Sequence, residues 1–262
     1  MLAACTAQTW SELMYRSVSA LLVAAALLSV PYRAGAADMP AGVKTPVASA
    51  PGYNWTGFYV GLNVGWGWAS ADWTNVANAT LFGDSVPPDT FSHSAQGFIG
   101  GGQIGFNYQT GVWVFGVEAL LNGSDIHGAR ASTFGAADDQ FTWSIDALLL
   151  VTARVGIAHD RWLAYAKGGY AGALIRAAVS DTVGPSTGSG SDSRWRSGWT
   201  VGGGVEYGLT PNLSLAVEYN YVELESGRYE LGGGAGRYAW GVYPRGTHLA
   251  LVKLSYRFAA LP

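Results

Sequence analysis

The strongest structural signal in the sequence is one run of residues, Trp55-Thr56-Gly57-Phe58-Tyr59-Val60-Gly61-Leu62-Asn63-Val64-Gly65-Trp66-Gly67-Trp68. From Phe58 onward every second residue is large and apolar, and the residues between are mostly small or polar. A repeat of two residues is typical of a β-strand, whose successive side chains point to opposite faces. In a soluble protein the apolar face would pack on a core. In an outer-membrane barrel it would meet lipid, and the small, polar face would line a narrow interior.

The remainder of the chain favours the barrel, because seven further segments alternate in the same way. They are residues 96–108, 111–122, 143–158, 161–175, 195–208, 212–224 and 247–258. Each is close to the roughly ten residues that a tilted strand needs to cross a bilayer. The sequence therefore predicts an all-β fold, an eight-stranded antiparallel up-and-down transmembrane β-barrel.

The connections between these segments alternate in length. Residues 109–110, 159–160 and 209–211 form tight turns. The connections around 70–95, 123–142, 176–194 and 225–246 are each on the order of twenty residues, and long outer loops with short periplasmic turns are typical of outer-membrane barrels. We therefore expect four long surface loops, with both ends of the barrel on the turn side.

Tracing the strands alternately up and down sorts the aromatic side chains into two belts, as the two headgroup levels of a bilayer would require. The loop-side belt is expected to contain Trp66, Trp68, Trp143, Trp195, Trp199 and Tyr221. The turn-side belt is expected to contain Trp55, Tyr108, Trp113, Tyr207, Tyr256 and Phe258. A soluble β-sandwich has no physical reason to sort its aromatic residues in this way.

The N-terminal region has the features of a secretory signal peptide. Arg16 precedes an apolar run at 18–30, and Ala34-Gly35-Ala36 offers a cleavage site of small residues. The only cysteine, Cys5, lies ahead of that run. We expect residues 1–36 to be a signal peptide, residues 37–53 a flexible periplasmic segment, and residues 54–262 the outer-membrane barrel with its four loops.

Composition supports a glycine-spaced β-protein and gives no reason to expect a nucleic-acid partner. Glycine accounts for 37 of the 262 residues, 13% of the residues are charged, and the net charge is -3. Nucleic-acid binding depends on a basic surface that neutralises phosphates, and this sequence offers no basic excess. The aromatic content of 13% argues against a disordered chain.

Eight charged residues fall on the faces that we expect to line the interior. They are Glu118, Asp146, Arg154, Lys167, Glu206, Glu218, Lys253 and Arg257, four of each sign. An eight-stranded barrel is only wide enough for its own side chains, so these charges are expected to pair across it. A structural set of ion pairs is the first interpretation, and a selective pore is the alternative.

The remaining polar motifs do not form a pattern typical of a catalytic, cofactor or metal site. His93, His127, His159 and His248 lack a Cys or a His at metal-ligand spacing. Ser124, Asp125 and His127 include the residue types of a hydrolase, but proximity in a loop is not triad geometry. The sequence therefore predicts a non-enzymatic protein without cofactor or metal, and an enzymatic barrel such as a lipid A deacylase is a weaker alternative.

Three motifs resemble one known family. They are Asn54-Trp55-Thr56-Gly57-Phe58-Tyr59-Val60-Gly61, then Arg154-Val155-Gly156-Ile157-Ala158 with Asp160-Arg161-Trp162-Leu163, and the closing Leu254-Ser255-Tyr256-Arg257-Phe258. The chain is similar in these to the outer-membrane immunogenic proteins, the porin-like surface antigens of Gram-negative bacteria. The resemblance implies an OmpA-like barrel, and it implies that Tyr256 and Phe258 are the signal that the barrel-assembly machinery reads. Here four residues, 259–262, follow that aromatic end, which departs from the pattern of the family.

These expectations together place the protein in the cell outer membrane, surrounded by outer-membrane lipid and lipopolysaccharide. The resemblance implies a surface antigen that contributes to envelope integrity and presents its surface loops. Some members of the family bind haemin, so a barrel that binds haemin or another small ligand is an alternative function. A narrow porin is a further alternative.

Overall fold

A computed structural model describes residues 53–75, 80–81, 84–85, 90–131, 139–181, 188–233 and 236–258. The expected signal peptide, all of the leader except Tyr53, and the four residues after Phe258 lie outside the described residues. The chain divides into two units, residues 1–49 and 50–262, and all of the described residues lie in the second. Among the described residues there is no helix long and apolar enough to cross a bilayer.

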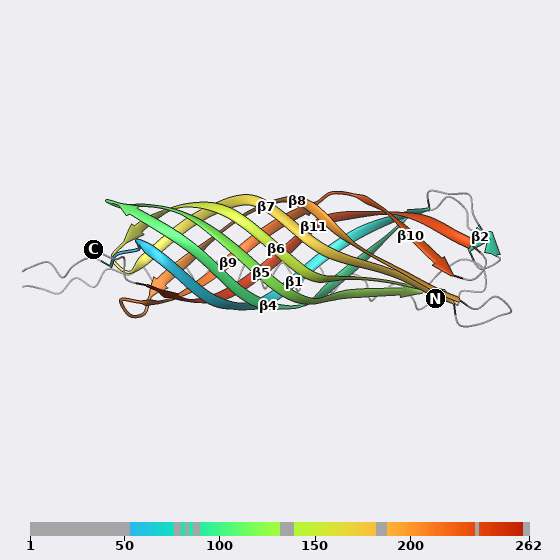
Figure 1. The fold of residues 1–262 in the computed structure, drawn as a ribbon, viewed down its shortest axis with the longest axis horizontal. Coiled ribbons are helices and arrows are strands. Elements are labelled where there is room, and N and C mark those ends of the chain that lie inside the picture. The colour runs from blue at the N-terminus through green and yellow to red at the C-terminus, as the bar shows by residue number, and fades with distance from the viewer. Residues whose placement is uncertain are drawn as a thin grey trace, which may run out of the picture. The chain divides into compact units, whose positions relative to one another are not determined.

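The described residues form strands joined by short turns (Figure 1). The strands are β1 (Gly57–Asn75), β2 (Thr80–Leu81), β3 (Asp84–Ser85), β4 (Thr90–Thr110), β5 (Trp113–Ala131), β6 (Asp139–His159), β7 (Trp162–Asp181), β8 (Gly188–Gly208), β9 (Leu213–Leu224), β10 (Gly227–Gly233) and β11 (Gly236–Arg257). Strands β2 and β3 pair only with each other.

The long strands close into a barrel. Neighbours pair antiparallel in the order β1-β4-β5-β6-β7-β8-β9-β11, and β11 returns to pair with β1, from Tyr59↔Arg257 to Asn75↔Trp240. Strand β10 pairs with β11 beyond the end of β9 and so continues the position of β9, the seventh barrel strand. The predicted eight-stranded antiparallel barrel is confirmed. Closure pairs the backbone groups of the first and last strands, which lipid could not satisfy.

Most of the strands are longer than the sequence pattern indicates. Strands β4, β6 and β8 each have 21 residues, and β11 has 22. Much of the four connections that we expected to be long loops is therefore strand. The expectation failed because it ended each strand where large apolar residues stop alternating, whereas the strand pairing continues past that point.

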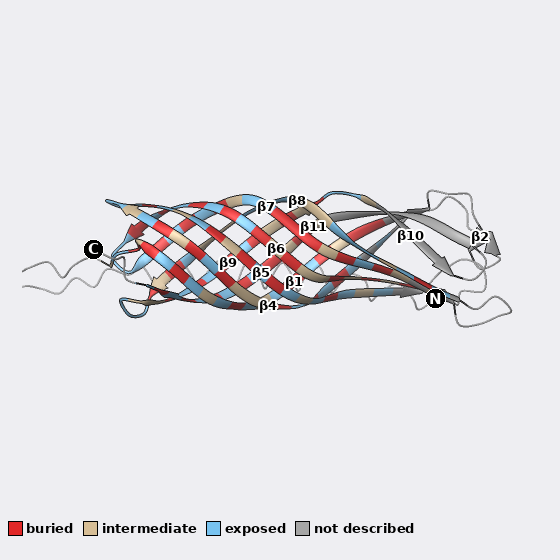
Figure 2. Ribbon diagram, viewed as in Figure 1, coloured by how far each residue is buried: buried red, intermediate tan, exposed pale blue. Residues whose placement is uncertain are grey.

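Between the turns and the middle of the strands, buried and exposed residues alternate along each strand (Figure 2), and the exposed side chains are mostly apolar. They include Phe58, Leu62, Phe98, Val117, Leu121 and Val217, each at least 58% exposed. Residues between them on the same strands, such as Asn63, Glu118 and Glu218, are buried inside. An apolar surface this extensive marks a membrane-facing band, in which hydrocarbon takes the place of water as the solvent.

Beyond this band, towards the loop side, the outer face of the wall becomes polar and the inner face becomes apolar. On β4 the outward residues change from Phe98 to Gln96 and Ser94, while the inward residues change from Gln103 to Ile99 and Ala95. Inside the barrel at this level lies a cluster of buried apolar side chains: Leu120, Ile126, Phe141, Trp143, Ile145, Leu148, Leu150, Ile175, Val222, Leu224, Leu249 and Leu251. The loop-side half of the barrel is thus built like a soluble β-barrel, with an apolar core and a polar exterior.

An irregularity in β6 explains one group of incorrect expectations. The pairing of β6 with β7 shifts between Ile145 and Ala147, so β6 has one extra residue there. Such a bulge reverses which alternate residues face inward on its far side. Trp143, which we expected to face outward, is therefore buried inside together with Ile145, at 2% and 1% exposure.

The aromatic belts are present with two corrections. Trp66, Trp68, Trp195 and Trp199 are exposed at the loop side of the apolar band, and Tyr108, Trp113, Tyr256 and Phe258 are exposed at the turn side. Trp143 is not part of the first belt because of the bulge in β6. Trp55 is not part of the second belt, because its side chain lies inside the barrel with 0% exposure.

The exchange of surface chemistry predicts how an added charge will affect stability. Val117→Arg places a cation in the lipid-facing band and should cost about 2–4 kcal/mol, whereas Ser94→Arg on the polar outer wall should cost about 0–1 kcal/mol. Reversible urea unfolding in phospholipid vesicles measures both. Equal costs at the two positions would contradict the exchange of surface chemistry, because both side chains would then face the same solvent.

Candidate functional site

The centre of the barrel interior contains a closed ring of four charges. Lys167 Nζ donates to Glu118 Oε1 at 2.8 Å and to Glu218 Oε1 at 2.9 Å. Lys253 Nζ donates to Glu118 Oε1 at 2.6 Å and to Glu218 Oε2 at 2.9 Å. Each lysine thus binds both carboxylates. The four residues of the ring come from four different strands, β5, β7, β9 and β11. Ions so fully removed from water are stable only when they are paired and hydrogen-bonded in this way.

Two tyrosines complete the coordination of this ring. Tyr59 Oη donates to Glu118 Oε2 at 2.8 Å, and Tyr165 Oη donates to Glu218 Oε2 at 2.7 Å. Sequence reasoning missed both of them. Both tyrosines alternate with outward-facing residues on their strands. The place of Tyr59 next to a large apolar, lipid-facing residue such as Phe58 is the sequence signal that predicts an inward side chain.

A second ionic group lies beside the ring. Arg154 Nε donates to Asn107 Oδ1 at 2.8 Å, and Arg154 Nη1 approaches Glu206 Oε2 at 3.4 Å. Its guanidinium lies over the rings of Tyr59 and Tyr165, 4.8 and 5.0 Å from their centroids. A cation between two aromatic faces gains a further electrostatic attraction.

Seven of the eight charges that we expected inside are buried there. Glu118, Arg154, Lys167, Glu206, Glu218 and Lys253 meet in the two groups above. Arg257 is buried separately at the turn-side mouth, where Arg257 Nη2 donates to the Pro211 carbonyl at 3.2 Å. The expectation for Asp146 was wrong, since this residue lies in the β6 bulge and its carboxylate pairs with the exposed Arg176 at 3.1 Å.

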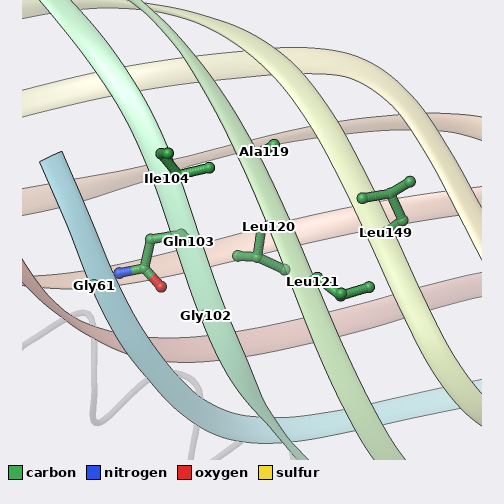
Figure 3. A pocket seen from close by; sticks show the side chains of 8 residues that line it. All are labelled: Gly61, Gly102, Gln103, Ile104, Ala119, Leu120, Leu121 and Leu149. Atoms are coloured by element: carbon green, nitrogen blue, oxygen red, sulfur yellow. The ribbon is translucent and has the colours of Figure 1, made fainter. Parts of the chain in front are cut away.

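Two hollows in the wall offer little chemistry. One, of about 360 Å³, is lined by Gly61, Gly102, Gln103, Ile104, Ala119, Leu120, Leu121 and Leu149 (Figure 3). The other, of about 290 Å³, is lined by Tyr53, Asn54, Gln109 and Gly111. Neither lining includes an Asp, Glu, His, Ser or Cys, the usual acids, bases and nucleophiles of hydrolysis.

The Ser124, Asp125 and His127 motif does not assemble a triad. Ser124 Oγ accepts a hydrogen bond from the Ile126 amide at 3.1 Å, and His127 Nδ1 lies 2.9 Å from the Asp125 carbonyl oxygen. A triad needs its histidine bonded to the serine hydroxyl. Among the residues that the structure describes, no three His, Cys, Asp or Glu side chains gather where they could hold a metal ion.

Comparison with known proteins agrees with the barrel and its lipid-facing band. Residues 20–258 match the family model described as outer membrane protein beta-barrel domain. The chain belongs to this family. It is 33% identical to the 25 kDa outer-membrane immunogenic protein of Brucella canis, over 82% of this chain and 88% of that protein.

A second relative is the 31 kDa outer-membrane immunogenic protein of Brucella melitensis, 28% identical over 72% of this chain and 80% of that protein. The resemblance stated from the sequence motifs is therefore confirmed, and the protein is an outer-membrane protein.

The charge ring leads to a prediction for Glu218→Leu. Removing one carboxylate leaves Lys167 and Lys253 with Glu118 alone, and breaking a buried pair costs about 3–5 kcal/mol. Asp146→Leu is the matched control, because it breaks a partly exposed pair worth about 0–1 kcal/mol. Urea unfolding in vesicles compares the two variants.

The same variant tests the pore interpretation in planar bilayers. Conductance should stay near zero in Glu218→Leu, because apolar side chains fill the barrel on both sides of the ring. A large single-channel current in this variant, absent from Asp146→Leu, would instead support a narrow porin.

Proposed function

We propose that the protein is a non-enzymatic surface protein of the outer membrane, which contributes to envelope integrity and presents its loop-side hairpins to the exterior. One observation carries this proposal: side chains fill the described interior in three successive layers. An apolar cluster with Trp55 at the turn side is followed by the charged groups and then by the loop-side apolar core. A filled barrel suits a structural and interactive role better than transport.

The loop-side half supports the second part of the proposal. Its apolar core, with Phe141, Trp143 and Ile145, lies beyond the aromatic belt, and its outer wall carries Ser94, Gln96 and His127. A packed core makes this extension rigid, so it holds the connecting hairpins away from the lipid. The relatives' names describe those proteins as immunogenic, which is in keeping with an exposed position.

The interior charges would serve stability in this proposal. The ring of Glu118, Lys167, Glu218 and Lys253 ties four strands together across the barrel. Tyr256 and Phe258 lie at the turn-side end of β11, with ring centroids 5.3 Å apart and both side chains about half exposed. We propose that they form the signal for the barrel-assembly machinery.

Deletion of the coding sequence tests the proposed role in the envelope. We expect the deletion strain to admit more of an apolar fluorescent dye and to be more sensitive to detergent, with both defects restored by the wild-type chain. Antibodies against the loop-side hairpins should bind intact cells. A strain with an unchanged barrier, and hairpins hidden on intact cells, would contradict the proposal.

Haemin binding is a second candidate, and one outward cluster favours it. Tyr219 Oη and His248 Nδ1 share a hydrogen bond of 2.6 Å, and the His248 ring stacks on Trp68 at 5.5 Å with an angle of 8°. A tyrosine oxygen is one of the known axial ligands of haem iron, and flat rings suit a flat ligand. The simpler interpretation is that these rings only pack against one another within the aromatic belt.

Titration of the folded barrel with haemin distinguishes the two interpretations of this cluster. Binding through Tyr219 would shift the Soret band, and Tyr219→Phe would abolish the shift. The matched control is Tyr221→Phe, whose hydroxyl is hydrogen-bonded to Glu223 instead. Identical spectra for both variants would exclude Tyr219 as the ligand.

A further inference from the structure

The residues just before the first strand lie inside the turn-side mouth of the barrel. Trp55 has no exposed surface and packs with Val114, Ala158, Leu163 and Tyr165, which come from β5, β6 and β7. The outward aromatic residues at the same end are different, since Phe58 is 63% and Trp162 is 52% exposed. Trp55 therefore fills the interior at the level where its neighbours face lipid.

Hydrogen bonds fix this segment to the end of β4. The Trp55 amide donates to Gln109 Oε1 at 2.8 Å, and the Gln109 amide donates to Thr56 Oγ1 at 3.0 Å. Tyr53 packs against Trp55 with ring centroids 4.6 Å apart. Burial raises the pKa of the Tyr53 phenol.

A cation from the last strand holds the two rings in place. The Arg257 guanidinium lies 4.5 Å from the centroid of Tyr53 and 5.1 Å from that of Trp55. Arg257 is buried, and Arg257 Nη2 donates to the Pro211 carbonyl at 3.2 Å. Cation–π attraction to the two aromatic faces stabilises this buried guanidinium.

Two glycines make room for this arrangement. Gly57 has φ of +140°, a conformation that other residues rarely adopt, and it turns the chain from the mouth into β1. At Gly208, a Cβ atom would lie 2.3 Å from the Tyr53 ring, so any larger residue there would displace Tyr53. The motif Trp55-Thr56-Gly57-Phe58 therefore places one ring inside the barrel and the next in the lipid.

We propose that residues 53–56 are a plug that binds in the turn-side mouth and closes the charged interior to solutes from that side. Behind the plug lies Tyr165, which bonds Glu218 of the charge ring. Removal of the plug would therefore give water and small ions a path towards buried carboxylates. The proposal is independent of the role assigned to the hairpins.

Thiol accessibility in the full-length chain tests the plug. In all variants Cys5, the only cysteine, is replaced by Ser. Ala158→Cys then reports on the mouth, because Ala158 is 7% exposed and packs in the Trp55 cluster. A small charged methanethiosulfonate should modify this thiol slowly while Trp55 is present. Trp55→Ala should raise the rate by at least about tenfold, which corresponds to about 1.4 kcal/mol in the opening equilibrium.

Trp162→Ala is the matched control, because it removes an indole from the outer face at the same end of the barrel. It should leave the rate unchanged. Migration before and after boiling confirms that each variant is folded, and Tyr53→Ala replaces Trp55→Ala if the latter does not fold. Rates that are equal in the wild-type, plug and control backgrounds would overturn the proposal, as would fast modification while the plug is intact.

Discussion

The fold depends on one constraint: in hydrocarbon, every backbone N–H and C=O group must find its partner within the protein. The chain meets it by pairing its first and last long strands, β1 and β11, from Tyr59↔Arg257 to Asn75↔Trp240. Closure leaves a narrow interior that side chains fill, so charged side chains there are stable only when they pair with one another. The ring of Glu118, Lys167, Glu218 and Lys253 is the result.

The barrel wall faces hydrocarbon along its turn-side half and water along its loop-side half. Its turn-side half has an apolar exterior around charges, and its loop-side half has a polar exterior around Leu120, Trp143 and Leu249. The exchange occurs along continuous strands, and the pairing of β1 with β4 and of β7 with β8 passes through it without a register shift. Because a rigid strand passes from one solvent to the other, the hairpins are held by the same hydrogen-bonded sheet that anchors the protein in lipid.

Much of this arrangement could be predicted from the sequence, because alternation over ten residues indicates both a strand and its lipid-facing side. The inward positions of Glu118, Glu218 and Lys253 followed directly from their place between large apolar neighbours. The bulge between Ile145 and Ala147 could not be predicted, since one extra residue leaves no compositional mark, and it moved Trp143, Ile145 and Asp146. The inward position of Trp55 could not be predicted either. Alternation assigns a side chain to a face only within a strand, and Trp55 precedes Gly57, where the first strand begins.

The central claim is that the outward side chains of the turn-side half are solvated by hydrocarbon. Spin labels on single cysteines along β5 in lipid vesicles test it most directly. Labels at 115, 117, 119 and 121 should be accessible to oxygen and shielded from a nickel chelate, labels at 116 and 120 should be shielded from both, and labels at 125 and 127 should meet the chelate. Access of the chelate to 117 and 119, with the label at 116 open to oxygen, would contradict this account of the barrel.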